Sequence, residues 1–419
     1  MKCRSTPLLL CINLVCACSN LFAQQDTTLS KETDIFDIAR SIFAKHADSA
    51  LHKKPKTVVI LPAIGYNPSI GFQYGISVTG GVYLSSQENT TLSVGAATAY
   101  MTTKGILAAQ FRHNVFTKGN KWNFQGNWQT TKMVVLDYGI GTGNMENRQG
   151  NFSWAGFILQ NPDSSFPITY KYLRFTERAY KEIAPHVYAG VGLSFDIREK
   201  IDDERLDSPL ITPHYTYSKL LGFDPTGYNA CGFLFDILYN TKEHPNRAFG
   251  GTYLDIGTRI NQTWIGSTKN AVQLLTELRQ YWSLSKRNPE EVLAIWHIGS
   301  YRLSGDLPYL ELPGTGQDTY GRSGRGYTAG RFKGPAYFYL ETEYRFPISA
   351  NKLFSGVVFL NMQSASNGAN IKLFQYWEPG YGAGLRVLFN KNTRTNICID
   401  YARGRYGSSG IFFGLNEAF

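Results

Sequence analysis

Residues 312–348 join a Gly- and Arg-rich segment to a strict alternation of polar and apolar side chains. In a strand, the alternation puts one set of side chains on a single face, namely Tyr337, Tyr339, Glu341, Glu343 and Arg345. A strand of a soluble sandwich buries its apolar face in a core, whereas a transmembrane barrel strand turns that face to lipid and its charged face to the lumen. This stretch alone leaves both architectures open.

The amino terminus has the three parts of a secretory signal peptide. Lys2 and Arg4 supply a basic start, Leu8 to Ala17 an apolar run, and Ala23 a plausible cleavage site before Gln24. We therefore expect residues 1–23 to be removed and the mature chain to leave the cytoplasm. An alternative is a lipoprotein signal with an acylated Cys18, although the residues before it fit that signal poorly.

The cysteines exclude a disulfide scaffold. Four of the six lie in the predicted signal peptide, which leaves Cys231 and Cys398 in the mature chain. The alternation puts Cys231 on the face of Phe233 and Phe235, and Cys398 on the face of Asp400. We expect the two thiols to face opposite sides of the wall and to remain unpaired.

The composition favours a membrane β-barrel over a helical membrane protein. After the signal, no apolar run approaches the roughly 18 residues that a membrane helix needs. The sequence instead has 26 Tyr, 26 Phe, 7 Trp and 41 Gly, which is typical of a barrel with aromatic girdles. The net charge of +10 suits anionic lipid head groups, and no nucleic-acid-binding motif accompanies it. We expect outer-membrane lipids as partners and no nucleic acid.

We expect residues 24–56 to form a short periplasmic arm ahead of a barrel that spans 57–419. Apolar residues at helical spacing predict an amphipathic helix within 31–47, ending before the basic linker 52–56. One interpretation is an interfacial or lumen-plugging arm, and the other is a docking helix for a periplasmic or outer-membrane protein.

From residue 57 to 419 the sequence alternates in long segments broken by polar turns. Fifteen strands can be delimited: 68–84, 91–101, 105–115, 122–131, 168–179, 184–198, 229–241, 249–261, 271–284, 292–304, 336–347, 353–363, 381–390, 395–403 and 410–419. Residues 138–158 are indistinct. Because a bacterial barrel normally has an even number of strands, we predict an all-β, 16-stranded transmembrane antiparallel barrel. So wide an interior needs a plug, for which Asp202–Pro213 and 305–335 are the long loops available.

The last predicted strand has the pattern of an outer-membrane targeting signal. Phe413, Leu415 and Phe419 fall on one apolar face, and the sequence given ends on the aromatic residue. Glu417 would share that face, so we place it at the periplasmic interface.

Several motifs resemble a known family. Gly324-Arg325-Gly326-Tyr327, the run Glu343 to Ile348, the run Gly380 to Arg386 and Ile399 to Ala402 together resemble the carboxy-terminal barrel of the bacterial surface-antigen superfamily, the BamA/TamA-like outer-membrane assembly and translocation factors. The resemblance covers about residues 57–419 and is most specific over 312–419. Since the arm is too short for the family's periplasmic polypeptide-transport-associated domains, the chain resembles a bare-barrel form.

The resemblance implies a latch in the lumen. In the family, an Arg between two Gly at a loop tip folds into the barrel and meets acidic wall residues, which makes Arg325 the latch here. A buried guanidinium needs carboxylate partners, and Glu341, Glu343 and Asp400 are the candidates on lumen faces. The family often has an Asp in the following strand where this sequence has Asn361, so we expect a looser latch or one that uses Glu343.

No enzyme motif or metal-ligand spacing is present, so we expect no catalytic residues, metal or cofactor. The leading hypothesis is an outer-membrane barrel that assists insertion or transport of proteins or lipids through a lateral seam. The alternatives are a passive or gated pore for solutes and a structural barrel that anchors a periplasmic partner.

Overall fold

The computed structural model describes residues 32–43, 57–67, 69–85, 90–143, 152–154, 157–159, 165–204, 212–319, 321–391 and 393–419. The predicted signal peptide, its cleavage site, the alternative acylation site and the basic linker lie outside the described residues.

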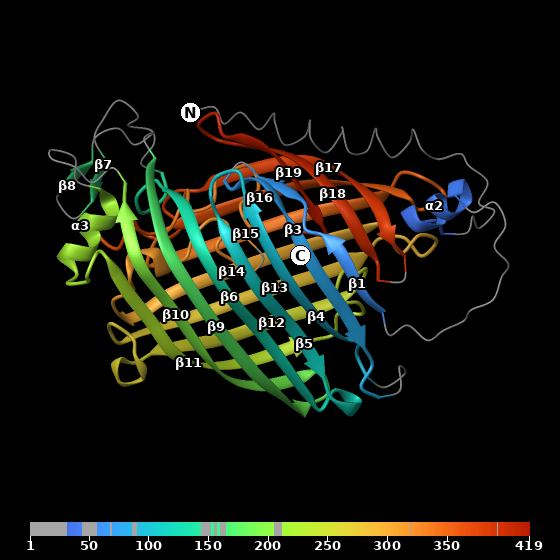
Figure 1. Ribbon diagram of the computed structural model, residues 1–419, viewed down its shortest axis with the longest axis horizontal. Helices are drawn as coiled ribbons and strands as arrows, with labels where there is room; N and C mark the ends of the chain where they lie inside the picture. Colours follow the sequence, from blue (N-terminus) through green and yellow to red (C-terminus); the bar gives the residue numbers. More distant parts are fainter. Residues whose placement is uncertain are drawn as a thin grey trace, which may run out of the picture.

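The long alternating segments form a closed antiparallel barrel of sixteen strands (Figure 1). Its first strand is interrupted, so that β1 (Thr57–Pro62) and β2 (Gly65–Asn67) both pair with β3 (Gly71–Val82). The wall continues with β4 (Ser93–Thr102), β5 (Leu107–Phe116), β6 (Trp122–Asp137), β9 (Phe166–Ala184), β10 (Val187–Asp203), β11 (Gly227–Asn240), β12 (Gly251–Asn261), β13 (Ala271–Ser283), β14 (Val292–Gly305), β15 (Ala336–Pro347), β16 (Phe354–Ala365), β17 (Glu378–Asn390), β18 (Thr395–Gly404) and β19 (Ser409–Leu415).

The predicted strand number is confirmed, but the missing strand lies elsewhere. The described parts of the indistinct stretch 138–158 contribute no strand to the wall; within it and just beyond, β7 (Phe152–Trp154) and β8 (Phe157–Leu159) pair only with each other. The sixteenth strand is the split segment 57–67. Its run TVVILP is apolar at every position between its ends and so lacks the alternation on which the sequence-based count relied.

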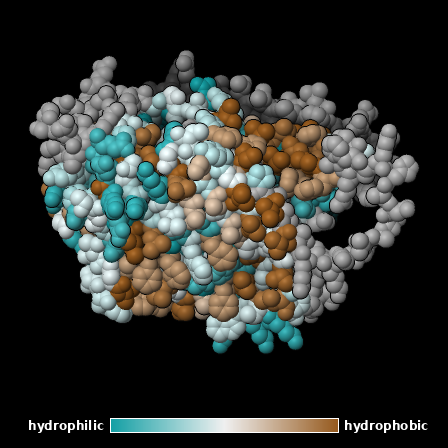
Figure 2. Space-filling view, viewed as in Figure 1, coloured by the Kyte–Doolittle hydropathy of each residue, from teal (hydrophilic) through white to brown (hydrophobic). Residues whose placement is uncertain are grey.

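The two faces of the wall differ as a membrane barrel requires. On β3 the outward residues Phe72, Tyr74, Ile76 and Val78 are 38–59% exposed. On β15 the polar face from Tyr337 to Arg345 is at most 3% exposed, because it points into a filled interior. Figure 2 shows hydrophobic side chains over the middle of the outer wall. The alternation therefore belongs to a barrel and not to a soluble sandwich.

The barrel has two unlike ends (Figure 1). We call the end where β1 begins and β19 finishes the turn end. We call the opposite end, with α3 (Pro213–Leu220) and the described residues of the connections after β6, β10 and β14, the loop end. None of the described helices is long and apolar enough to cross a membrane.

Helix α2 (Ile35–Phe43) lies at the turn end, against the outside of the barrel. The ring of Phe36 packs edge-on against Phe389 of β17 at 5.0 Å, and Phe389 belongs to the outward side of that strand. The Lys391 ammonium binds the Asp37 carboxylate at 2.6 Å, and the Asp34 carboxylate accepts the Asp37 amide at 2.9 Å as an N-cap. Within the described part of the predicted helix 31–47, the helix does not plug the lumen.

Cys231 and Cys398 are unpaired, as expected, and both are buried.

The barrel closes through an unusually short contact. β19 pairs with β2 at one register position, Phe413 with Tyr66, whereas β1 pairs with β3 alone. At Asn416 the backbone takes φ 66°, and the tail 416–419 leaves the line of the strand to enter the lumen. Among the described residues, the second edge of β1 therefore has no strand partner. We call this part of the wall the seam.

Two expectations for the last strand are wrong. Phe419 does not lie on the outer face of β19; it is 6% exposed and stacks on Trp296 inside the barrel with ring centroids 5.2 Å apart. Glu417 is 4% exposed among arginines and not at a membrane interface. The reason in both cases is the left-handed turn at Asn416, which ends the alternation.

The turn at Asn416 can be tested directly. A β-branched side chain disfavours positive φ, so Asn416→Val should lower the free energy of unfolding by about 1–2 kcal/mol, while Asn416→Gly should leave it nearly unchanged. Urea unfolding of the refolded protein in detergent measures both. Equal stabilities for the two variants would contradict the inward turn.

Candidate functional site

The loop between β14 and β15, residues 306–335, folds back into the barrel and is tied to the wall at three levels. At its base, Glu311 accepts from the guanidinium groups of Arg198 and Arg259, the latter at 3.3 Å. Both arginines project inward from β10 and β12 and are at most 7% exposed. The carboxylate thus fixes the start of the loop against two neighbouring strands of the wall.

The second level of contacts with the wall comes from Lys333 and Thr315. The Lys333 ammonium lies 2.6 Å from the Asp137 carboxylate and over the ring of Tyr309, whose hydroxyl donates to the same carboxylate at 2.8 Å. The Thr315 hydroxyl donates to the side-chain oxygen of Gln363 at 2.6 Å. The loop is therefore an ordered plug.

The loop tip carries Arg325, which is 4% exposed and meets three carboxylates. Its guanidinium lies 2.5 Å from Glu341, 2.8 Å from Asp400 and within bonding distance of Glu343. The guanidinium also lies 3.6 Å from the ring centre of Phe359. Burying so many charges is favourable only when all are paired in good geometry, and here the planar guanidinium reaches all three acids.

Glycines allow the tip to approach the wall. Gly324 and Gly326 have φ 78° and 102°, and a Cβ on Gly326 would lie 2.9 Å from the backbone of Arg403. On the wall, a Cβ on Gly380 would lie 2.7 Å from the Arg325 carbonyl oxygen. The sequence therefore needs glycine on both sides of this contact.

The remaining residues proposed for the latch are also at the tip. The Tyr327 hydroxyl donates to the Pro379 carbonyl at 2.6 Å and accepts the Arg405 amide at 2.9 Å. Asn361 donates its side-chain amide to the Arg325 carbonyl at 2.9 Å. Asn361 thus binds the backbone of the tip, and the charged partners come from Glu341, Glu343 and Asp400.

Two chains of ion pairs run from the loop tip to the tail 416–419. In the first, Glu343 bridges Arg325 and Arg345, and Arg345 donates to the main-chain oxygen of Phe419 at 3.0 Å. In the second, Asp400 bridges Arg325 and Arg386, and Arg386 donates to Glu417 at 2.8 Å. Burial acts to raise the pKa of the Glu417 carboxyl, but Arg386, Arg345 and Arg247 outweigh it and hold that pKa below its usual range.

Arg322, three residues before the tip arginine, caps the end of β19. Its guanidinium donates to the carbonyl oxygens of Leu415 at 2.6 Å and Asn416 at 3.3 Å, and to that of Glu417. The amide and carbonyl of Asn416 bind the β18 side, so the carbonyl of Leu415 points away from β18, toward the edge where a strand would normally supply a donor.

Sequence reasoning gave no role to Arg322 or Arg386, and it placed Glu417 and Phe419 on the wrong face. Arg386 could have been found, because it shares the lumen face of Gly380, Gly382 and Gly384 in an alternating strand. Arg322 and the tail carry no periodic signal.

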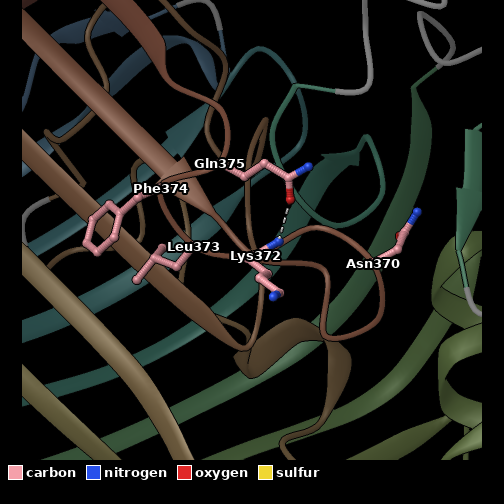
Figure 3. A pocket seen from close by; sticks show the side chains of 5 residues that line it. All are labelled: Asn370, Lys372, Leu373, Phe374 and Gln375. Atoms are coloured by element: carbon pink, nitrogen blue, oxygen red, sulfur yellow. Dashed lines mark hydrogen bonds between the residues drawn. The ribbon is translucent and has the colours of Figure 1, made fainter.

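Other features of the surface and lumen offer less chemistry. The connection 366–377 has an open hollow lined by Asn370, Lys372, Leu373, Phe374 and Gln375, in which the Lys372 amide donates to the Gln375 side chain at 3.0 Å (Figure 3). Within the described ranges, no group of His, Cys, Asp and Glu is arranged to hold a metal ion.

Comparison with known proteins identifies the fold. No protein-family model and no curated protein sequence matches the chain. The structure is similar to BamA from Haemophilus ducreyi lacking POTRA domains 1–3, with TM-score 0.54 and 14% identity over 87% of this chain and 71% of that chain. It is also similar to CdiB from Acinetobacter baumannii, with TM-score 0.50 and 12% identity over 85% of this chain and 58% of that chain. The chain thus has the 16-stranded barrel fold expected from the BamA/TamA-like resemblance, and it spans less than two thirds of CdiB.

Removing the tip guanidinium should release the plug. Arg325→Ala leaves three buried carboxylates without their shared partner, so we expect the free energy of unfolding to fall by about 3–5 kcal/mol and trypsin to cut faster at Arg331. The matched control is Arg302→Ala, which breaks a half-exposed pair with Asp306 and should cost at most about 1 kcal/mol. Equal behaviour of the two variants would contradict the role of Arg325.

Loss of the Arg322 cap should fray the closing strand. Hydrogen bonds to a charged donor contribute about 1.5–3 kcal/mol, so in Arg322→Ala the Asn416 amide should exchange with deuterium at least about tenfold faster. In Arg322→Lys, which keeps one ammonium group, the exchange rate of the Asn416 amide should lie between those of the wild type and Arg322→Ala. An unchanged exchange rate in Arg322→Ala would show that the cap does not stabilise the strand end.

Proposed function

We propose that this protein is an outer-membrane barrel of the assembly or translocation type, which helps proteins or lipids enter or cross the membrane through the seam between β1/β2 and β19. The fold shared with BamA and CdiB supports a barrel of this class. The apolar outer wall supports its place in a membrane. The charged contacts in the lumen support the more specific proposal that substrates pass through the seam.

The observation that carries the proposal is the physical link between the loop tip and the seam. Arg325 binds Glu343 and Asp400, and these two acids bind the arginines that hold the tail 416–419. The tail is turned inward, which leaves the second edge of β1 without a strand among the described residues. Withdrawal of the loop tip would therefore take Arg325 from the two acids that also bind Arg345 and Arg386, and the Arg322 cap from β19, in one movement.

The mechanism follows from the cost of unpaired strand edges in a membrane. Backbone groups at an edge facing lipid lack donors and acceptors, so an open seam binds any chain that supplies a strand. The register contact of Phe413 with Tyr66 is the part of the closure that must break. In this mechanism the latched loop holds the seam closed, and a substrate strand replaces the lost pairing while the loop is displaced.

A gated pore is the second candidate, because the same loop fills the lumen through three sets of wall contacts. Release of the loop tip would then open a conducting path through the lumen, and the seam would stay closed. An anchor barrel is the third candidate, since α2 lies on the outside at the turn end, where a partner could reach it.

Locking the seam should abolish the proposed activity. Cysteines at Tyr66 and Phe413, which are register partners, should form a disulfide when Cys231 and Cys398 are replaced by Ser. We expect liposomes containing this protein to accelerate insertion of a small unfolded barrel protein, and the oxidised variant to lose that acceleration until it is reduced.

The matched control is a disulfide between positions Ala99 and Ala109, which are register partners in the intact wall of β4 and β5. It should leave the acceleration unchanged. Acceleration that persists with the seam locked would refute the lateral seam.

Conductance in planar bilayers separates the assembly barrel from the pore. We expect small, flickering currents in the wild type and larger ones in Arg325→Ala, because the plug is held by the tip. Large, steady currents in the wild type would favour the pore.

A further inference from the structure

Lys132 of β6 and Lys171 of β9 form a like-charge pair on the outside of the barrel. They are direct register partners, and both side chains point outward and are exposed. Like charges opposite each other on one face of a sheet destabilise it. Neither ammonium has an ion pair or hydrogen bond with any described residue. Among the register partners of the two lysines, Glu199 of β10, opposite Lys171, is the one opposite charge.

The height of the pair on the wall matches a membrane surface. At the turn end of the same strands, Lys181 lies over the ring of Trp122 at 5.7 Å, an aromatic and basic pair typical of an interface. Lys132 follows Trp122 by ten residues, which corresponds to about 25 Å along the barrel axis for a strand tilted by about 40°. This height equals the usual thickness of the apolar band of a membrane barrel, so the lysine pair lies at the opposite surface.

The wall below the pair is apolar. Leu107 is the register partner of Lys132 on β5, whereas Leu173 and Trp128 lie farther toward the turn end on β9 and β6. Their side chains are 55%, 48% and 41% exposed, respectively. Glu177, farther down this wall, is satisfied by His113 at 3.2 Å and by the Trp128 ring nitrogen at 3.1 Å. A ligand with an anionic head and apolar chains would contact the ammonium groups and this surface together.

The other charges near the pair define the field that a ligand would meet. Glu199 of β10 is the register partner of Lys171 on its other side and is exposed. Lys104 lies in the turn between β4 and β5, close to the end of β5 that pairs with Lys132. Lys200, Asp202 and Glu204 follow Glu199 toward the loop end and are exposed as well, so the lysines near the pair outnumber the acids by four to three. Figure 2 shows hydrophilic side chains gathered toward the loop end of this wall.

We propose that Lys132 and Lys171 bind the phosphate group of an anionic lipid whose chains lie on the apolar wall beneath them. This proposal rests on the membrane placement in the proposed function but not on opening of the seam. The phosphate lies between the two ammonium groups and removes their repulsion. The acyl chains cover the exposed leucines and the tryptophan.

The test measures lipid retained by the full refolded chain in detergent, by native mass spectrometry, with diphosphoryl lipid A, phosphatidylglycerol and phosphatidylcholine as probes. We expect retention in that order. A lysine at a lipid surface contributes about fivefold in affinity, so Lys132→Gln with Lys171→Gln should weaken lipid A binding on the order of 25-fold. Glu199→Gln should strengthen it, because a repelling carboxylate is removed.

Lys181→Gln is the matched control, since it removes a lysine from the same strand and wall at the turn end. It should bind lipid A as the wild type does. An equal loss in Lys181→Gln and in the double variant, or no loss in either, would overturn the proposed site. Full displacement of lipid A by an equal concentration of inorganic phosphate would assign the site to free phosphate and overturn the lipid.

Folding and membrane insertion are read separately, from the heat-dependent gel mobility of each variant and its recovery with liposomes. A chain that folds and inserts but shows no lipid preference refutes this site alone. A chain that folds but does not insert refutes the proposed function as well.

Discussion

The structure depends on one buried guanidinium. Arg325 brings its charge into the barrel only because Glu341, Glu343 and Asp400 surround it. Two of these acids have a second arginine, since Glu343 also binds Arg345 and Asp400 also binds Arg386. Removing Arg325 leaves Glu341 without a cation and takes one of two arginines from Glu343 and from Asp400, and an unpaired buried charge costs far more than the pair contributes. The main effect of the network is therefore to fix the loop in one position, and its contribution to the free energy of unfolding is secondary.

The same network contacts the strand that closes the barrel. A sixteen-stranded wall normally protects its strand edges by pairing each edge along its length. Here the last strand, β19, pairs with β2 only at Phe413. Beyond that pair, the carbonyls of Leu415 and Glu417 accept hydrogen bonds from Arg322 of the loop. The tail then takes its stability from Trp296, Arg345 and Arg386 inside the lumen. A loop side chain thus binds carbonyls at the end of the last strand, and the register contact of Phe413 with Tyr66 joins that strand to β2.

The sequence predicts those parts of the molecule that repeat. Polar and apolar alternation locates most wall strands and assigns Glu341, Glu343 and Asp400 to the lumen, because every second residue of a strand shares one face. Glycine on both sides of Arg325 indicates a tip that can approach a wall, and the structure shows that approach at Gly380. These inferences need only the period of a strand and the cost of an unpaired charge.

The rest depends on single residues that break the pattern. Continued alternation would put Glu417 and Phe419 on the lipid face, where a carboxylate is costly. One left-handed residue, Asn416, instead takes both side chains into the lumen, and nothing local distinguishes this asparagine from one in an ordinary turn. Glu417 is the clue in hindsight, because an acid on an apolar face needs a cation, and Arg386 on the lumen face is one that could meet it. A charge that contradicts a strand pattern is therefore better explained by a change in backbone direction than by tolerance at a membrane interface.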